Sequence, residues 1–399
     1  MIGGAGKKDQ MASIVSCRQQ TQAITVQEYR DRVERVCEKM RISGHDALYL
    51  DATTSLYYFT GLKCHPSERL HGAVIRSDGD IHYICPAFER EKTTDAMILE
   101  GGFLVWEEHE NPVDELVAYL KSADGNCQCR LAVDPQTPFF TINRLQTACG
   151  WLDVCDGEEL IASCRRIKSA HEIALMQVAK NATLSVHQAV AGILHEEIDT
   201  REVQAFLDEA HIAAGMDGRS TFRIVLFGEP TAYPHGVSYP QNLKDGDMVL
   251  IDTGATMHGY HSDITRSYVY GEPTARQREI WSIEQEAQAA AFDAAQIGAP
   301  CSAPDDAARR VIEAAGLGPD YQTPGLPHRT GHGIGLDVHE QPYIVRNNSL
   351  GLAPGMCFSI EPMICCYGEF GVRLEDHVYM TADGPKWFTH PSRSIDRPF

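Results

Sequence analysis

The hydrophobic positions of the first 160 residues switch repeatedly between a helical and a strand-like period. Residues 26–44 place an apolar side chain every three or four positions and end at Gly44, which predicts an amphipathic helix closed by a glycine. Short apolar runs predict strands at 46–50, 73–75, 81–85 and 130–133, and periodic segments predict helices at 87–99 and 113–121. Residues 1–22 show neither period, and we expect a flexible tail there. The alternation predicts a smaller α/β domain over residues 23–160.

The second part of the chain has a different pattern, with longer helices and clustered strands. After a break at 156–169, apolar periodicity predicts a long helix from Ala170 and a second helix from about Thr200. Further segments predict strands at 222–227, 248–252 and 267–270, helices at 274–297 and 303–315, and short strands punctuated by glycine and proline thereafter. This pattern predicts an α+β domain over residues 161–399.

Composition narrows the class of protein without identifying it. The 399 residues are 43% hydrophobic and 23% charged, as in a globular protein, and their length suits two domains. Lys and Arg number 35 against 55 Asp and Glu, so the net charge of −20 disfavours binding to nucleic acid or to an anionic membrane. The sequence has no run of about 18 apolar residues and no signal-peptide core near residue 1. Thirteen cysteines without a C-x-x-C pair indicate a reducing compartment, so we expect a cytoplasmic protein.

Two aspartates flank a predicted hairpin. Asp252 ends the apolar strand Val-Leu-Ile-Asp, a Thr-Gly turn follows, and Asp263 lies further on in Ser-Asp-Ile-Thr-Arg. A hairpin can bring both carboxylates to one point, where oxygen ligands suit a hard divalent cation. Taken alone, either aspartate is better explained as a turn or capping residue.

Three histidines lie close together in Pro-His-Arg-Thr-Gly-His-Gly-Ile-Gly-Leu-Asp-Val-His-Glu, at positions 328, 332 and 339. The spacing of the first two is that of a zinc-binding helix, but Arg329 stands where H-E-x-x-H requires glutamate, and the interspersed glycines oppose a helix. The glycines also lack the G-x-G-x-x-G spacing of a nucleotide-binding loop. They fit a backbone that passes close to a metal ligand.

Two further carboxylates stand at the ends of predicted strands. Glu361 follows Cys-Phe-Ser-Ile and precedes a proline, and Glu375 lies in Gly-Val-Arg-Leu-Glu-Asp-His. A glutamate in an apolar strand is costly unless it is paired or bound to a metal. Each signal is weak by itself, and the weight comes from the order of all the segments along the chain.

In that order the segments resemble the creatinase/aminopeptidase P/prolidase family of metallopeptidases. The matching motifs run from about residue 163 to the C-terminus: the D-T-G turn, S-D-I-T-R, G-H-G-I-G followed by H-E-x-P, E-P and R-L-E-D. The resemblance implies a pita-bread catalytic domain behind a creatinase-like N-terminal domain, which the first part of the chain matches only in length and alternation. The pattern is nearest to bacterial Xaa-Pro dipeptidases (prolidases), and it implies hydrolysis of the bond before a C-terminal proline.

The resemblance further implies a centre for two divalent metal ions, with Mn²⁺ expected and Co²⁺, Fe²⁺ or Zn²⁺ as alternatives. The implied ligands are Asp252, Asp263, His332, Glu361 and Glu375.

Other residues receive roles in catalysis and substrate binding from the same resemblance. Glu361 would also carry a proton to the leaving nitrogen, and His235 and His339 would stabilise the tetrahedral intermediate. Arg373 would orient Glu375. His328 and Arg346 are the expected substrate-binding residues, Arg346 for the substrate carboxylate.

The sequence leaves several alternatives open. Aminopeptidase P, ectoine hydrolase and dimethylsulfoniopropionate lyase share the scaffold, and a non-catalytic binding module is a further alternative, although such modules have lost the ligands. Phe222 stands where many relatives carry a tyrosine that approaches the metals, which puts the metal preference in doubt. The pair Cys365 and Cys366 either senses redox state or packs. The family expectation is a homodimer that acts on a small peptide.

Overall fold

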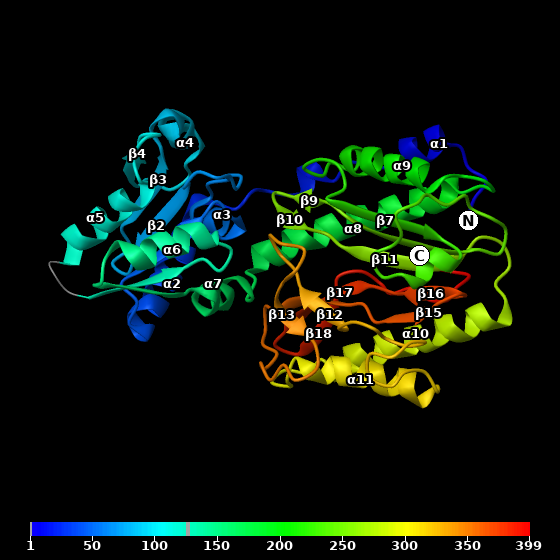
Figure 1. The fold of residues 1–399 in the computed structure, drawn as a ribbon. Coiled ribbons are helices and arrows are strands. Elements are labelled where there is room, and N and C mark those ends of the chain that lie inside the picture. Colours follow the sequence, from blue (N-terminus) through cyan, green and yellow to red (C-terminus); the bar gives the residue numbers. More distant parts are fainter. Residues whose placement is uncertain (1, 125–127) are drawn as a thin grey trace. The chain divides into compact units, whose positions relative to one another are not determined.

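The chain forms two compact units in the computed structural model, which describes residues 2–124 and 128–399 (Figure 1). The smaller unit spans residues 24–165, and the larger unit joins residues 166–399 to the segment before residue 24. The boundary falls after helix α7 (Glu158–Arg165), because Leu160 and Ile161 of this helix are buried and the helix packs against α2 (Val26–Ser43). The predicted break at 156–169 therefore contains a helix.

The smaller unit is a mixed sheet with the strand order β4-β3-β2-β1-β5-β6. Its strands are β1 (Ala47–Asp51), β2 (Gly72–Arg76), β3 (Ile81–Pro86), β4 (Gly102–Trp106), β5 (Cys129–Val133) and β6 (Leu152–Asp156). The pairs β1–β2 and β2–β3 are antiparallel, and the pairs β3–β4, β1–β5 and β5–β6 are parallel. Its remaining helices are α3 (Thr54–Thr60), α4 (Arg90–Ala96), α5 (Pro112–Asp124) and α6 (Phe139–Ala148). This is the expected α/β domain.

Helix α2 shows why the sequence pattern predicts this unit well. Thr25 and Glu28 form a reciprocal capping box at its start, and Gly44 ends it with a φ of 71°. Only glycine adopts that left-handed conformation at little cost, so the predicted stop is confirmed.

The larger unit consists of two halves, each with a pair of helices against a sheet (Figure 1). In the first half, α8 (Ala170–Ile193) and α9 (Thr200–Ala213) share a core with the sheet β11-β8-β7, formed by β7 (Phe222–Phe227), β8 (Met248–Gly254) and β11 (Ile264–Val269). The short hairpin of β9 (Thr256–Met257) and β10 (Tyr260–His261) connects β8 to β11.

In the second half, α10 (Ala275–Ala294) and α11 (Ser302–Ala314) pack on a five-stranded sheet and on a hairpin. The sheet has the order β13-β12-β14-β17-β18, and β15 pairs with β16. The bounds are β12 (Gly331–Gly333), β13 (Glu340–Ile344), β14 (Cys357–Ile360), β15 (Met363–Cys366), β16 (Phe370–Arg373), β17 (Asp376–Thr381) and β18 (Gly384–Trp387). The two halves meet where Thr265 in β11 pairs with Glu375 between β16 and β17. The expected α+β class is confirmed.

The N-terminal segment corrects the expectation of a flexible tail over residues 1–22. Residues 7–13 form helix α1 (Lys7–Ser13), and the main-chain N–H groups of Gly3 and Ala5 donate hydrogen bonds of 2.7 and 2.9 Å to the carbonyls of Ala191 and Gly192 in α8. Arg18 forms an ion pair of 2.5 Å with Asp217. The sequence pattern misses these contacts because they join positions about 200 residues apart, as with the 199 positions between Arg18 and Asp217.

Candidate metal centre

Three carboxylates converge where the two halves of the larger unit meet. Asp252 lies in β8 directly opposite Thr265 of β11, and Asp263 immediately precedes β11. Glu375 comes from the other half and pairs through its main chain with Thr265. One carboxylate oxygen from each of these three residues lies within 4.8 Å of the others, and all three side chains are buried. The predicted hairpin therefore does bring its two aspartates to one point.

These carboxylates are not satisfied by the protein itself. Asp252 Oδ1, Asp263 Oδ1 and Glu375 Oε1 are buried and have no hydrogen-bond partner among the described residues. A buried acceptor without a donor costs free energy comparable to a lost hydrogen bond or more. Open oxygens that meet at one point are the donor set that divalent cations prefer, so the residues fit the metal ions that the sequence implies.

The second half of the unit adds a histidine and a fourth carboxylate. His332 is the middle residue of β12, and its Nε2 lies 2.9 Å from Glu361 Oε1 and 3.7 Å from Asp263 Oδ2. His332, Glu361 and Glu375 form a second group with ligand atoms within 4.8 Å of one another. The structure thus brings together all five residues that the resemblance names as ligands.

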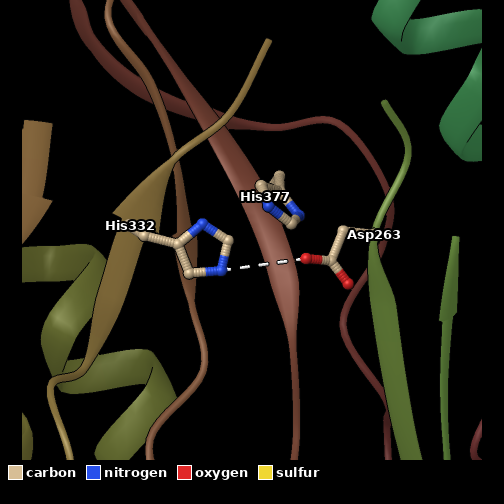
Figure 2. A group of neighbouring side chains, drawn as sticks. All are labelled: Asp263, His332 and His377. Atoms are coloured by element: carbon tan, nitrogen blue, oxygen red, sulfur yellow. Dashed lines mark ion pairs between the residues drawn. The ribbon is translucent and has the colours of Figure 1, made fainter. Parts of the chain in front are cut away.

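A further histidine, His377 in β17, lies beside the same cluster. Figure 2 shows its ring projecting toward the space between His332 and Asp263, and these three residues form a third group within the same 4.8 Å limit. Its Nε2 lies 3.9 Å from Glu375 Oε1. Burial and the charge of Lys180 lower the pKa of His377 well below its usual range.

The electrostatics of the cluster reflect the burial of several acids together. Burial raises the pKa of Asp263 and Glu375 well above the usual carboxyl range, and the neighbouring carboxylates raise it further. Burial also acts on Glu361, but the positive charges of His332 and Arg373 outweigh it and hold the pKa of Glu361 at about 2. Burial and mutual repulsion thus disfavour the charged forms of Asp263 and Glu375, whereas the positive neighbours of Glu361 favour its charged form.

Arg373 holds one of these carboxylates in place, though not the predicted one. Its Nη2 donates to Asp252 Oδ2 over 2.6 Å and its Nε donates to the Thr265 hydroxyl over 3.2 Å. That hydroxyl donates in turn to Glu375 Oε2 over 2.7 Å. Arg373 therefore contacts Asp252 directly and reaches Glu375 through Thr265.

Of the three predicted pocket histidines, His339 contacts His332 directly. The rings of His339 and His332 meet edge to face with centroids 4.2 Å apart. Burial and the charge of His332 lower the pKa of His339 to about 4, so its ring is neutral near pH 7. His328 is half-buried with its Nδ1 2.7 Å from the Arg329 carbonyl; burial lowers its pKa and the charge of Glu361 opposes that shift. His235 is exposed and lines a cavity of about 270 Å³ next to β7.

The structure does not bring Arg346 to the cluster. Its guanidinium forms an ion pair with Asp320 and lies 5.8 Å from the ring centre of Tyr321. Arg329 is better placed, since it stacks on Tyr343 at 4.4 Å and its charge acts on the pKa of His339. The only sequence signal for Arg329 is its position within the histidine segment.

Lys180 in α8 is a second residue that the sequence pattern does not single out. Its side chain is fully buried, its Nζ has no hydrogen-bond partner within the described ranges, and the Phe388 ring centre is 5.4 Å away. Burial lowers its pKa to about 8, and the charges of Asp263 and Glu375 oppose that shift. The Lys180 side chain on α8 is therefore close enough to Asp263 and Glu375 for their charges to act on its pKa.

The other open questions from the sequence concern packing. Phe222 is the first residue of β7 and pairs with Gly254, which follows Asp252 by two residues in β8. Its side chain has no hydroxyl to offer to the site. Cys365 and Cys366 are buried in the core of the second half, and burial raises the pKa of Cys365 to about 12. Both are free thiols in a packed core, which supports packing over redox sensing.

A buried acid and imidazole cluster between two sheet-and-helix halves defines a metal-dependent hydrolase of the pita-bread type. Residues 174–382 match metallopeptidase family M24, and residues 32–167 match the creatinase/prolidase N-terminal domain. The chain belongs to metallopeptidase family M24.

Similar proteins cover almost the whole chain. It is 34% identical over 355 residues to a putative dipeptidase of Bacillus subtilis (89% of this chain and 96% of that protein). It is 32% identical over 358 residues to the Xaa-Pro dipeptidase of Lactobacillus delbrueckii subsp. lactis (88% and 95%). Among solved structures, dipeptidase PepE from Mycobacterium ulcerans has a TM-score of 0.85 at 32% identity (92% and 97%). A prolidase from Thermococcus sibiricus has a TM-score of 0.83 at 28% identity (92% and 98%).

The helices of the described residues also bear on whether the chain crosses a membrane. No helix among the described residues combines the length and the apolar character that a membrane crossing requires.

Proposed function

We propose that this protein is an Xaa-Pro dipeptidase that cleaves the bond before a C-terminal proline with the help of two divalent metal ions. The observation that carries the proposal is the convergence of five donor residues, of which Glu361 is half-buried and the other four are buried. Asp252, Asp263 and Glu375 each keep one oxygen without a hydrogen-bond partner among the described residues. The similarity to an Xaa-Pro dipeptidase and to prolidases supports the substrate class. Mn²⁺ is the proposed metal, because four carboxylates outnumber one imidazole in the set of five, and Co²⁺, Fe²⁺ and Zn²⁺ are the alternatives.

The metals would be held by Asp252, Asp263, His332, Glu361 and Glu375. When bound, a pair of divalent cations would lower the pKa of a water to near neutral pH and would also polarise the scissile carbonyl.

The chain's own residues position the substrate and move the proton. Glu361 is ionised and therefore able to accept a proton at Oε and to release it to the leaving nitrogen. His339 is neutral, so its N–H can donate a hydrogen bond to the oxygen of the tetrahedral intermediate, with His235 as the second donor. His328 is the proposed substrate-binding histidine, in line with the effect of the Glu361 charge on its pKa.

The substrate carboxylate needs a cation, and Arg329 replaces Arg346 in our proposal. Arg329 acts on His339 and stacks on an aromatic ring, whereas Arg346 is engaged by Asp320. We further propose a cytoplasmic homodimer whose partner is the small peptide substrate, with no role in binding nucleic acid or membranes, in line with the net charge of −20.

The test is hydrolysis of Ala-Pro, Leu-Pro, a longer Xaa-Pro peptide and ectoine by chelator-treated protein, with and without Mn²⁺. The proposal requires metal-dependent cleavage confined to the dipeptides. Cleavage of the longer peptide would indicate an aminopeptidase, and turnover of ectoine alone would overturn the peptidase assignment of the substrate. Arg329→Gln should raise KM for Leu-Pro and leave kcat nearly unchanged, while Arg346→Gln should change neither.

A further inference from the structure

The strand that follows Glu375 presents a second imidazole to the metal centre. Side chains alternate along a strand, so Glu375 and His377 project to one face and Asp376 to the other. Asp376 confirms this alternation, because its Oδ1 accepts a hydrogen bond of 2.8 Å from Arg266 Nη2 behind the site. His377 is thus on the same face as a proposed ligand.

The sheet register brings His377 toward His332. Strand β14 lies between β12 and β17, and Ser359 of β14 pairs directly with His377. On the other side, the main-chain N–H of His332 donates a hydrogen bond of 2.9 Å to the Ser359 hydroxyl. The two imidazoles therefore flank one small residue, and their ring centres come within 6.1 Å of each other.

The ring of His377 makes few polar contacts with the described residues. It is 0% exposed, and neither Nδ1 nor Nε2 makes a hydrogen bond within the described residues. The nearest polar neighbours are the main chain of Asp263 and the Oε1 of Glu375, itself one of the open oxygens. Burying an imidazole with two unsatisfied nitrogens is costly unless a ligand completes it.

We propose that His377 is a sixth metal ligand, which binds together with Asp263 and His332 and gives the centre a second imidazole. This inference rests on the proposed metal centre and is independent of which peptide is cleaved. All three residues lie within the 4.8 Å limit, and Figure 2 shows them facing a common space. Two imidazoles shift the donor set toward nitrogen, which favours Zn²⁺, Co²⁺ and Fe²⁺ relative to Mn²⁺.

The first experiment uses the unaltered protein loaded with Co²⁺ after chelator treatment. Paramagnetic NMR resolves the exchangeable N–H signals of imidazoles bound to Co²⁺, and we expect two such signals, from His332 and His377. A single imidazole signal at full Co²⁺ loading would overturn the proposal while leaving the metal centre intact. Failure to bind any Co²⁺, Mn²⁺ or Zn²⁺ would overturn the metal centre as well.

The second experiment compares His377→Leu with His187→Leu. His187 is also buried, at 1% exposure, and lies in α8 with its Nε2 2.9 Å from the Ile264 carbonyl, so its replacement controls for the loss of a buried imidazole. By competition against a chelating indicator, we expect His377→Leu to weaken Zn²⁺ and Co²⁺ binding at least ~10-fold and Mn²⁺ binding much less. Equal weakening in both variants, or unchanged Zn²⁺ affinity in His377→Leu, would contradict the proposal. If His377→Leu does not fold, the NMR result on the unaltered protein decides.

Discussion

Both units bury a pair of aspartates in or beside strands, but among the described residues only the pair in the larger unit has oxygens without a donor. In the smaller unit, Asp51 ends β1 and Asp134 follows β5. Asp51 accepts hydrogen bonds from the Tyr49 hydroxyl and the Ala52 N–H, of 3.0 and 2.8 Å. Asp134 accepts from the Thr53 hydroxyl and the Gln136 N–H, of 2.6 and 2.9 Å. Each oxygen of this pair has a donor.

In the larger unit, one oxygen of Asp252 and one of Asp263 have no donor among the described residues. The two pairs look alike in sequence, since Leu-Tyr-Leu-Asp and Val-Leu-Ile-Asp are both apolar strands that end in an acid. Burial raises the pKa of Asp51 and Asp263 alike. The comparison teaches that burial alone does not identify a metal centre, and that the mark of one is a set of acids that converge on one point and keep oxygens without donors.

The largest expected effect comes from removing a charge at the open pair. Asp263→Asn should lower dipeptide hydrolysis at saturating Mn²⁺ by more than roughly 100-fold, the upper end of the loss seen when only a supporting partner of a ligand is removed. Metal content by mass spectrometry should fall in parallel. Asp51→Asn is the matched control and should change neither the activity nor the metal content. An active Asp263→Asn variant would contradict the proposed difference between the two aspartate pairs.

The second-largest effect should come from replacing Arg373, which supports Asp252 through a hydrogen bond. Arg373→Lys keeps a charge but cannot bond Asp252, Thr265 and the Pro234 carbonyl together as the guanidinium does. We expect metal affinity to fall ~10–100-fold, measured by titration calorimetry. Arg346→Lys, on the surface beside Asp320, should bind metal as the unaltered protein does. Equal affinities for both variants would remove Arg373 from the centre.

The buried ammonium tests the charge balance of the same pair. Lys180→Met removes a positive charge that acts on Asp263 and Glu375. Metal affinity should rise ~10-fold, because one unit of pKa, or about 1.4 kcal/mol, is a reasonable size for the lost repulsion. Titration of Mn²⁺ into chelator-treated protein measures it, and weaker binding would show that Lys180 supports the site instead.

The smallest effect concerns the satisfied pair and leaves activity unchanged. Burial raises the pKa of Asp51 to about 6 from an ordinary 3.8, although its hydrogen bonds oppose the shift. The folded state therefore holds a proton that the unfolded state has released, and the free energy of unfolding falls as pH rises from about 4 to about 6. Asp51→Asn should lack this fall. Relative to the unaltered protein, its free energy of unfolding should therefore be ~2 kcal/mol higher at pH 7 than at pH 4. Calorimetry of both proteins at the two pH values measures the difference, and parallel curves would contradict it.

Much of the fold could be predicted because its signals are local. The capping boxes of α2 and α8, the glycine stop at Gly44 and the apolar run of β7 all lie within a few residues of the elements they define. Helices α3, α6 and α7 and strands β4 and β6 were missed, since they are short and their apolar residues are explained only by packing.

The candidate site shows the same division. The order of motifs names five residues that the structure brings together, but it gives Arg373 the wrong direct partner. Lys180 looks like any polar residue of a long helix, and only the fold buries it. His377 directly follows the R-L-E-D motif in the sequence, but its position beside His332 depends on the register of β14 and β17. Nothing in the sequence period records that register.

The contact of residues 2–23 with α8 has a consequence for synthesis. The main-chain N–H groups of Gly3 and Ala5 donate hydrogen bonds to the carbonyls of Ala191 and Gly192 in the last turn of α8. These two acceptor residues leave the ribosome only after the whole smaller unit has been synthesised. The smaller unit is therefore an insertion within a discontinuous larger one, and it can fold first while the N-terminal segment waits. Once folded, it shortens the loop that must close, because a compact insert separates its ends less than a free chain would. The larger unit is the last to be completed, and its first residues are among the last to find their place.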